Sequence, residues 1–105
     1  MFKTFFILVL VSISSSSLAN NFGDPALGKI KSPSCVFCHG ATGTTSNPAY
    51  PNLAGQDALY LFNAMKAYQN GERQGAFADM MKAQLQRLNE QDLKDIAAFY
   101  SSQNK

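Results

Sequence analysis

The chain contains 105 residues, among them two Cys, one His and no Trp, and this length allows one small domain but not a two-domain enzyme. Nine Lys and Arg face seven Asp and Glu, and the formal charge of +2 is too small for a basic surface that binds nucleic acid. Apolar residues reach 46% and charged residues 15%, which excludes a disordered tail.

Residues 1–19 have the three parts of a secretory signal peptide. Lys3 supplies the positive charge, residues 5–11 form an apolar run, and Ser17-Leu18-Ala19 supplies the small residues before a cleavage site. A retained membrane anchor would need about 20 apolar residues, whereas this run soon gives way to serines. We therefore expect cleavage near Ala19, a periplasmic location, no stable membrane insertion after cleavage, and a mature domain over residues 20–105.

The mature chain is expected to open with a short helix that begins at Asp24-Pro25 and extends to about Lys31. Asp is a good helix cap, and proline is favoured at the first helical position. Ser32-Pro33 is expected to end or kink this helix. Gly28 lowers helix stability by about 1 kcal/mol relative to Ala, so we expect another helix to approach closely there.

Cys35-Val36-Phe37-Cys38-His39 is a C-x-x-C-H string, the attachment pattern of c-type haem. Two thiols separated by two residues on a helical turn have the spacing of the two porphyrin vinyl groups to which they bond. His39 follows directly and is expected to bind the iron as the proximal ligand. The string therefore predicts one covalently bound haem c.

Three other metal or redox sites fit the same string less well. A thioredoxin-like redox pair needs a βαβ pattern, and this chain has almost no alternating β-branched runs. A closed zinc site usually needs four ligands, and the chain has no further Cys or His. Copper(I) bound by Cys35, Cys38 and a Met is the stronger rival, because thiolate and thioether are both suitable ligands.

The middle of the chain is expected to form a loop, a helix and a second loop. Residues 40–55 are rich in Gly, Thr, Ser, Asn and Pro without periodicity, as in a long loop that wraps a prosthetic group. A helix is expected from Gln56 or Asp57 to about Asn70, followed by Gly71. Residues 71–81 are expected to form the next loop, with a short helical piece between Met81 and Leu88.

A second axial iron ligand would have to be Met65, Met80 or Met81. Met65 lies within a helical apolar pattern and is expected to fill the core. Spacing alone does not separate Met80 from Met81. If neither binds iron, the protein would be a five-coordinate haem sensor or a peroxidase-like domain.

Asn89 is expected to cap a final helix, with Asp92 three residues later. This helix has a single apolar stripe, formed by Leu93, Ile96, Ala97 and Tyr100. The predicted fold is therefore an all-α domain of three or four helices joined by long loops. Because such loops make a poor core without the porphyrin, we expect the protein without haem to be largely unfolded.

In these features the mature chain resembles a class I c-type cytochrome, most closely a single domain of the bacterial cytochromes of the c-four and c-five type. The resemblance extends from about Gly23 to Ser102. Its anchors are Gly28, the haem string with Gly40, the Pro51-Asn52-Leu53-Ala54-Gly55-Gln56 segment, the Leu88–Leu93 motif and the Ile96–Tyr100 segment. The c-four relatives have two domains, whereas this chain has one haem string.

The resemblance also implies roles for single residues. The Pro51 carbonyl is expected to accept the N–H of the proximal imidazole, and Leu53 to form an apolar wall beside the ring. In this family the ligand Met stands seven residues before the Leu that opens the last helix motif, which selects Met81 rather than Met80. Gly28 is expected to pack against Phe99 and Tyr100.

The function implied by the resemblance is one-electron transfer by a carrier that is not an enzyme. Expected partners are redox protein donors and acceptors, such as membrane respiratory complexes or terminal oxidases, that dock through a small transient interface. The alternative is an electron-delivery subunit of a larger redox enzyme complex. Arg73 and Gln56 are candidates for contact with a haem propionate. The sequence does not predict the oligomeric state.

Overall fold

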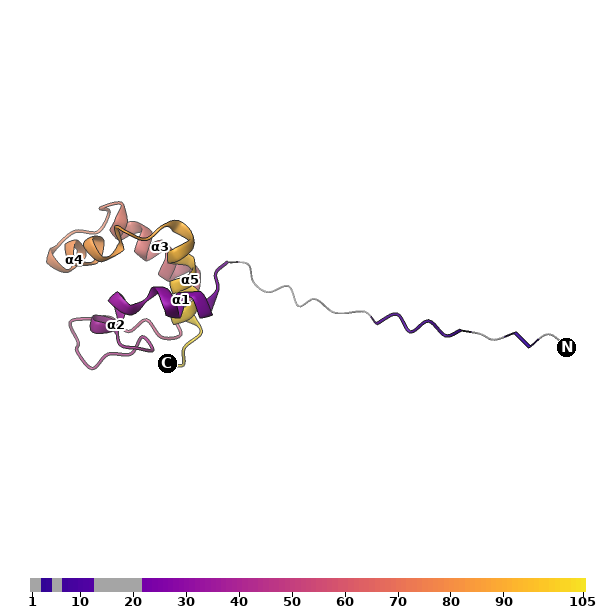
Figure 1. Cartoon of the computed structure of the whole chain (residues 1–105). Helices are drawn as coiled ribbons and strands as arrows, with labels where there is room; N and C mark the ends of the chain where they lie inside the picture. The colour runs from indigo at the N-terminus through magenta and orange to yellow at the C-terminus, as the bar shows by residue number, and fades with distance from the viewer. Residues whose placement is uncertain (1–2, 5–6, 13–21) are drawn as a thin grey trace.

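The computed structural model describes residues 3–4, 7–12 and 22–105, and the predicted cleavage site at Ala19 lies outside them. These residues form five helices and no strand, so the prediction of an all-α fold is confirmed. The helices are α1 (Pro25–Lys31), α2 (Pro33–His39), α3 (Ala58–Gln69), α4 (Ala76–Leu85) and α5 (Glu90–Ser101) (Figure 1). None of the helices in these ranges is both long and apolar enough to cross a bilayer.

Helix α1 packs across α5 (Figure 1). Asp24 caps α1 by accepting hydrogen bonds from two backbone N–H groups of the first turn, as its position before Pro25 predicted. Gly28 is buried at the crossing. The position needs glycine because a Cβ there would clash with the Asp95 carbonyl and lie 2.7 Å from the Phe99 Cβ. The predicted close approach of helices is therefore present.

Gly28 approaches Phe99 as predicted, and Tyr100 lies next to Gly43. The closest atoms to a Cβ at Gly28 belong to Asp95 and Phe99, whereas a Cβ at Gly43 would lie 2.7 Å from Tyr100 Cδ1. Phe99 and Tyr100 are consecutive in α5, so their side chains leave the helix about 100° apart. One therefore faces α1 and the other faces the loop that follows α2.

The core is centred on the apolar stripe of α5. Its four predicted members are each at most 2% exposed, and they pack with two residues of α3 and one of α4; the stripe and its partners are Leu93, Ile96, Ala97, Tyr100, Leu61, Phe62 and Leu85. Asn89 begins α5 with a reciprocal capping box, in which its side chain and that of Asp92 each accept a backbone hydrogen bond. The predicted cap and stripe of the last helix are both confirmed.

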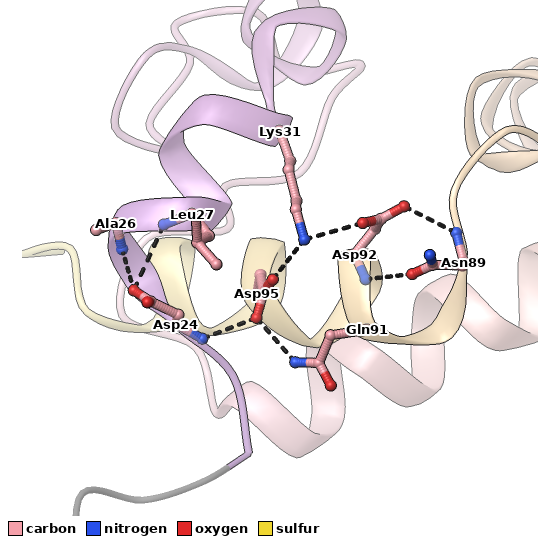
Figure 2. A network of polar contacts seen from close by, with 8 residues as sticks. All are labelled: Asp24, Ala26, Leu27, Lys31, Asn89, Gln91, Asp92 and Asp95. Atoms are coloured by element: carbon pink, nitrogen blue, oxygen red, sulfur yellow. Dashed lines mark hydrogen bonds and ion pairs between the residues drawn. The ribbon is translucent and has the colours of Figure 1, made fainter.

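A polar network lies at the crossing of α1 and α5 (Figure 2). The Asp95 carboxylate is 1% exposed and accepts hydrogen bonds from the Asp24 backbone N–H at 2.8 Å, the Gln91 amide at 2.9 Å and Lys31 Nζ at 2.6 Å. Lys31 also pairs with Asp92 at 2.9 Å. The network therefore connects the start and end of α1 to α5.

Ser32 and Pro33 separate α1 from α2, as predicted for a proline that interrupts a helix. The Ser32 hydroxyl donates to the Lys29 carbonyl, which satisfies one of the last carbonyls of α1. Helix α2 then places the whole C-x-x-C-H string in helical conformation. The predicted loop after it extends from Gly40 to the Asp57 cap of α3.

The prediction of a loop over residues 71–81 is wrong beyond Gly75, because α4 begins at Ala76 and contains both Met80 and Met81. Residues 76–85 are rich in Ala, Met and Leu, which are strong helix formers. The residue at the cap position is Gly75, which has no side chain to bond the first turn. The helix therefore lacks the local start signal on which sequence analysis depends.

Candidate functional site

A cavity of about 580 Å³ lies between two walls of the domain. One wall consists of α3 and α4, which pack against each other, and the other of α2 and the loop that follows it (Figure 1). Helix α5 contributes Ile96, Ala97 and Tyr100 at the back. All six residues predicted for the site line this cavity, namely Cys35, Cys38, His39, Pro51, Leu53 and Met81.

The imidazole of His39 is held in a fixed orientation. His39 is 5% exposed, and its Nδ1 lies 2.9 Å from the Pro51 carbonyl oxygen. Because a carbonyl oxygen can only accept, Nδ1 carries a proton, and in the neutral ring Nε2 is then the nitrogen with a free lone pair. A neutral imidazole with a hydrogen-bonded second nitrogen is the usual arrangement of a histidine that ligates a metal.

Cys35 and Cys38 are free thiols on successive turns of α2, each half-buried in the cavity wall. Burial raises the pKa of the Cys35 thiol, and the Ser34 hydroxyl and the charge of Arg87 partly oppose this rise. The pair is not joined in a disulfide, so both sulfur atoms are available for covalent attachment.

The two methionines of α4 differ in burial although both line the cavity. Met81 is half-buried and packs against the core cluster, whereas Met80 is 49% exposed. Met65, predicted to fill the core, also packs against that cluster. The Met81 thioether is therefore better placed than that of Met80 to contact a molecule held inside the cavity.

The cavity has one charged side chain among the described residues that line it, that of Arg73. Arg73 Nη1 donates to the Tyr68 hydroxyl at 3.0 Å, and its guanidinium lies 4.8 Å from the centroid of the Tyr68 ring. Hydrogen bonds to Tyr68 and Tyr60 raise the pKa of Arg73. This corner of the cavity therefore suits an anionic group.

The lining also includes a buried tyrosine whose hydroxyl lacks a hydrogen-bond partner of full geometry. Tyr100 is 1% exposed, and its hydroxyl is close enough to Ser32 for that side chain to affect its pKa, but the two do not form a hydrogen bond of full geometry. Burial raises the pKa of Tyr100 to about 12, so the hydroxyl keeps its proton at neutral pH. A buried polar group of this kind normally has a partner, which fits a cavity built to hold another molecule.

Sequence analysis missed the residues that connect the two walls. Tyr50 and Phe77 pack edge to face at 6.0 Å, and Arg87 donates to the Ser34 hydroxyl at 2.6 Å. The only signal in the sequence is that Tyr50 and Phe77 are large aromatic residues in segments otherwise rich in small ones. No pattern of spacing could pair residues that lie 27 or 53 positions apart.

Among the described residues, no group of three or more His, Cys, Asp or Glu lies together to hold a metal ion, so the zinc alternative lacks a ligand set there. The imidazole and the two thiols lie on one short helix and line one mainly apolar cavity. This lining suits a large, mainly apolar molecule rather than a bare ion.

Comparisons with known proteins agree on one family. Residues 28–104 match the family described as cytochrome c. Cytochrome c-554(548) of Halomonas halodenitrificans is 49% identical over 81 residues, which cover 77% of this chain and 98% of that protein.

Two solved structures share the fold. Reduced recombinant cytochrome c4 from Pseudomonas stutzeri superposes with a TM-score of 0.69 at 38% identity, covering 78% of this chain and 46% of that one. A thiosulfate dehydrogenase from Marichromatium purpuratum gives 0.73 at 29% identity over 86% of this chain and 21% of that one. The chain thus spans less than half the length of either.

Proposed function

Because the chain belongs to the cytochrome c family, we propose that it carries single electrons on one haem c that is bonded to Cys35 and Cys38 and ligated by His39 and Met81. The cytochrome c homologues of this chain are electron carriers rather than enzymes. The observation that supports this ligand set most strongly is the buried His39 ring, which donates to Pro51 and shares its cavity with Met81.

The family implies a covalently bound haem c, and the lining of the cavity fits this group. Its walls are mainly apolar, its one charged side chain suits a propionate, and the unpartnered Tyr100 hydroxyl is a free donor. When bound, the haem supplies an iron that accepts and releases one electron.

Each predicted site residue has a physical role in this proposal. Cys35 and Cys38 anchor the group to α2. The Pro51 carbonyl keeps the proton on His39 Nδ1, which makes Nε2 the ligand and raises its basicity. Leu53 is half-buried against the core and excludes water from the cavity beside His39. Met81 is a neutral, soft ligand, which favours the reduced state and raises the potential.

The proposed location is the periplasm, after cleavage of residues 1–19 near Ala19 to leave the domain over residues 20–105. The leader pattern of charge, apolar run and small residues supports this proposal. The partners we propose are redox protein donors and acceptors, such as membrane respiratory complexes or terminal oxidases. The formal charge after cleavage is only +1, because eight basic residues face seven acidic ones, so association should depend weakly on salt.

A second candidate function is electron delivery within a larger redox enzyme complex. It is favoured by the match to a thiosulfate dehydrogenase structure, of which this chain covers 21%. The two functions differ in how the native protein exists. Size-exclusion chromatography of extract from the source cells should give the haem-bearing chain at about 10 kDa if it is a free carrier, because cleavage removes 19 of the 105 residues of the 11.4 kDa chain. A stable complex with a dehydrogenase would support the alternative.

The ligand set is tested by the absorption spectrum of the full chain, produced in a host that matures c-type cytochromes. We expect colour that survives denaturation and a weak red band of Met-ligated ferric haem. Met81→Ala should abolish that band, whereas Met80→Ala, the matched control on the same helix, should keep it. A colourless protein would exclude haem c, and loss of the band only in Met80→Ala would overturn the ligand assignment.

A further inference from the structure

Helix α4, which contains Met81, is attached to the rest of the helical core along one side. Its extensive contacts with other helices are with α3, and α3 in turn packs on α5 (Figure 1). The opposite wall of the cavity is formed by α2 and the loop after it. The position of Met81 relative to His39 therefore depends on whatever joins α4 to that opposite wall.

The first connection is an aromatic contact before Met81 in the chain. The Phe77 ring, on the first turn of α4, packs edge to face on the Tyr50 ring with centroids 6.0 Å apart. Tyr50 also packs on the His39 ring at 6.4 Å. Tyr50 thus contacts both the proposed proximal ligand and the helix that contains the proposed distal ligand.

The second connection is a hydrogen bond after Met81 in the chain. Arg87, in the turn between α4 and α5, donates to the Ser34 hydroxyl at 2.6 Å. Ser34 is on the first turn of α2, next to Cys35, and lines the cavity. Phe77 and Arg87 therefore tie both ends of the α4 segment to the opposite wall, four residues before Met81 and six after it.

We propose that Phe77 and Arg87 are positioning residues that hold α4 closed and so keep Met81 within reach of the iron. The inference rests on the proposed function, because it concerns the same ligand. A Met thioether is an uncharged ligand that an external base can replace when its helix moves away. Aromatic pairs and charge-assisted hydrogen bonds each shift such an equilibrium by roughly threefold to tenfold.

The aromatic connection is tested by titrating the ferric holoprotein with imidazole. The loss of the red Met band is the signal that is monitored. Phe77→Ala and Tyr50→Ala should lower the apparent Kd for imidazole about threefold to tenfold. Tyr50→Phe keeps the ring, so its apparent Kd for imidazole should equal that of the parent protein. Phe77 is 57% exposed, so its truncation should not prevent folding.

Phe37→Ala is the matched control for the aromatic pair. Phe37 lines the same cavity and is 93% exposed, but its ring packs on no other ring among residues 22–105. Its truncation should leave the Kd for imidazole unchanged. An equal decrease in Phe37→Ala and Phe77→Ala would overturn the proposal, because it would indicate general opening of the cavity.

The polar connection is tested in the same assay with Arg87→Gln and Ser34→Ala, both of which should lower the Kd. Lys82→Gln removes a positive charge from α4 itself and is expected to have no effect. Unchanged Kd values in Phe77→Ala and Arg87→Gln, with a normal Met band in the parent protein, would refute the positioning role and leave the proposed function intact. Absence of the band from the parent protein would overturn both.

Discussion

Asp95 is a carboxylate buried where α1 crosses α5, and three donors converge on it (Figure 2). Asp95→Ala would leave the Asp24 N–H and the Gln91 amide without their acceptor and Lys31 without one of its two carboxylates. We expect the free energy of unfolding of the holoprotein to fall by about 2 to 4 kcal/mol. Urea unfolding followed by circular dichroism measures this change.

Glu90→Ala is the matched control on the same helix. Its carboxylate pairs with Lys94 at 3.9 Å and is largely exposed, so its removal should change the free energy of unfolding by less than about 0.5 kcal/mol. Equal effects of the two substitutions would show that burial of Asp95 does not matter.

The same network predicts how stability depends on pH. Burial by itself would raise the pKa of Asp95, but hydrogen bonds from Lys31, the Asp24 N–H and Gln91 outweigh it and lower the pKa below 3.8. Lys31 and the Asn89 N–H likewise lower the pKa of Asp92, and both carboxylates raise the pKa of Lys31 above 10.5. Stabilisation by the carboxylates is therefore complete above about pH 4 and is lost as the pH falls through the lowered values.

The stabilisation by Lys31 changes with pH in the opposite direction. It is complete below the ordinary pKa of 10.5 and is lost as the pH rises through the raised pKa of Lys31. Tm of the holoprotein, measured from pH 7 down to pH 2.5, should fall most steeply below pH 4. Asp95→Asn cannot ionise at this position and should give a lower but flatter curve over the same range. Parallel curves for the two proteins would contradict the assignment.

At the scale of elements, the crossing of α1 and α5 depends on the absence of a side chain at Gly28. A Cβ there would meet the backbone carbonyl of Asp95, which cannot move aside as a flexible side chain could. Although alanine favours a helix, we expect Gly28→Ala to lower the free energy of unfolding by about 1 to 3 kcal/mol. Ala26→Gly tests the opposite change on an exposed position of the same helix, where the loss should be about 1 kcal/mol or less.

Chemical denaturation of both holoproteins measures these effects. If Gly28→Ala proves as stable as the parent protein, the two helices do not pack as closely as the structure shows.

Elements with local signals were predictable from the sequence. Asp24 and Asn89 cap α1 and α5 through their own side chains, and Pro33 marks the break before α2. Only the later part of α4 was predicted, as a short helical piece after Met81, and its start was missed because Gly75 caps it without a side chain. In the site, the fixed spacing of Cys35 and His39 made them recognisable, whereas Pro51 and Met81 needed the family pattern.

Contacts between distant segments were not predictable, because they depend on how the helices pack. Asp95 and Lys31 are 64 residues apart, and Arg87 and Ser34 are 53 apart. The same holds for Tyr50 and Phe77, whose rings meet only when α4 lies opposite the loop after α2. Each residue alone has the appearance of an ordinary surface or loop residue.

For the whole molecule, the cavity predicts dependence of folding on the prosthetic group. Without the haem, the mainly apolar lining of a cavity of about 580 Å³ would face water instead of a packed group. A domain this small has little other apolar burial to offset that loss. We expect a Cys35→Ser, Cys38→Ser double variant without haem to be largely unfolded, with weak helical circular dichroism at 222 nm.

The control is the parent holoprotein at the same concentration, which should show strong helical signal and a cooperative melt. A cooperative melt in the haem-free double variant would contradict the prediction, because it would show that the helices pack without the group.

We propose that this chain is a one-electron carrier whose iron has protein ligands on both sides. The most direct test is an anaerobic redox titration of the holoprotein, followed by addition of carbon monoxide to the reduced sample. We predict one reversible transition with the one-electron slope of about 59 mV per tenfold change, and a reduced spectrum that carbon monoxide leaves unchanged. Formation of a carbon monoxide complex at once would reveal an open coordination position and contradict the account.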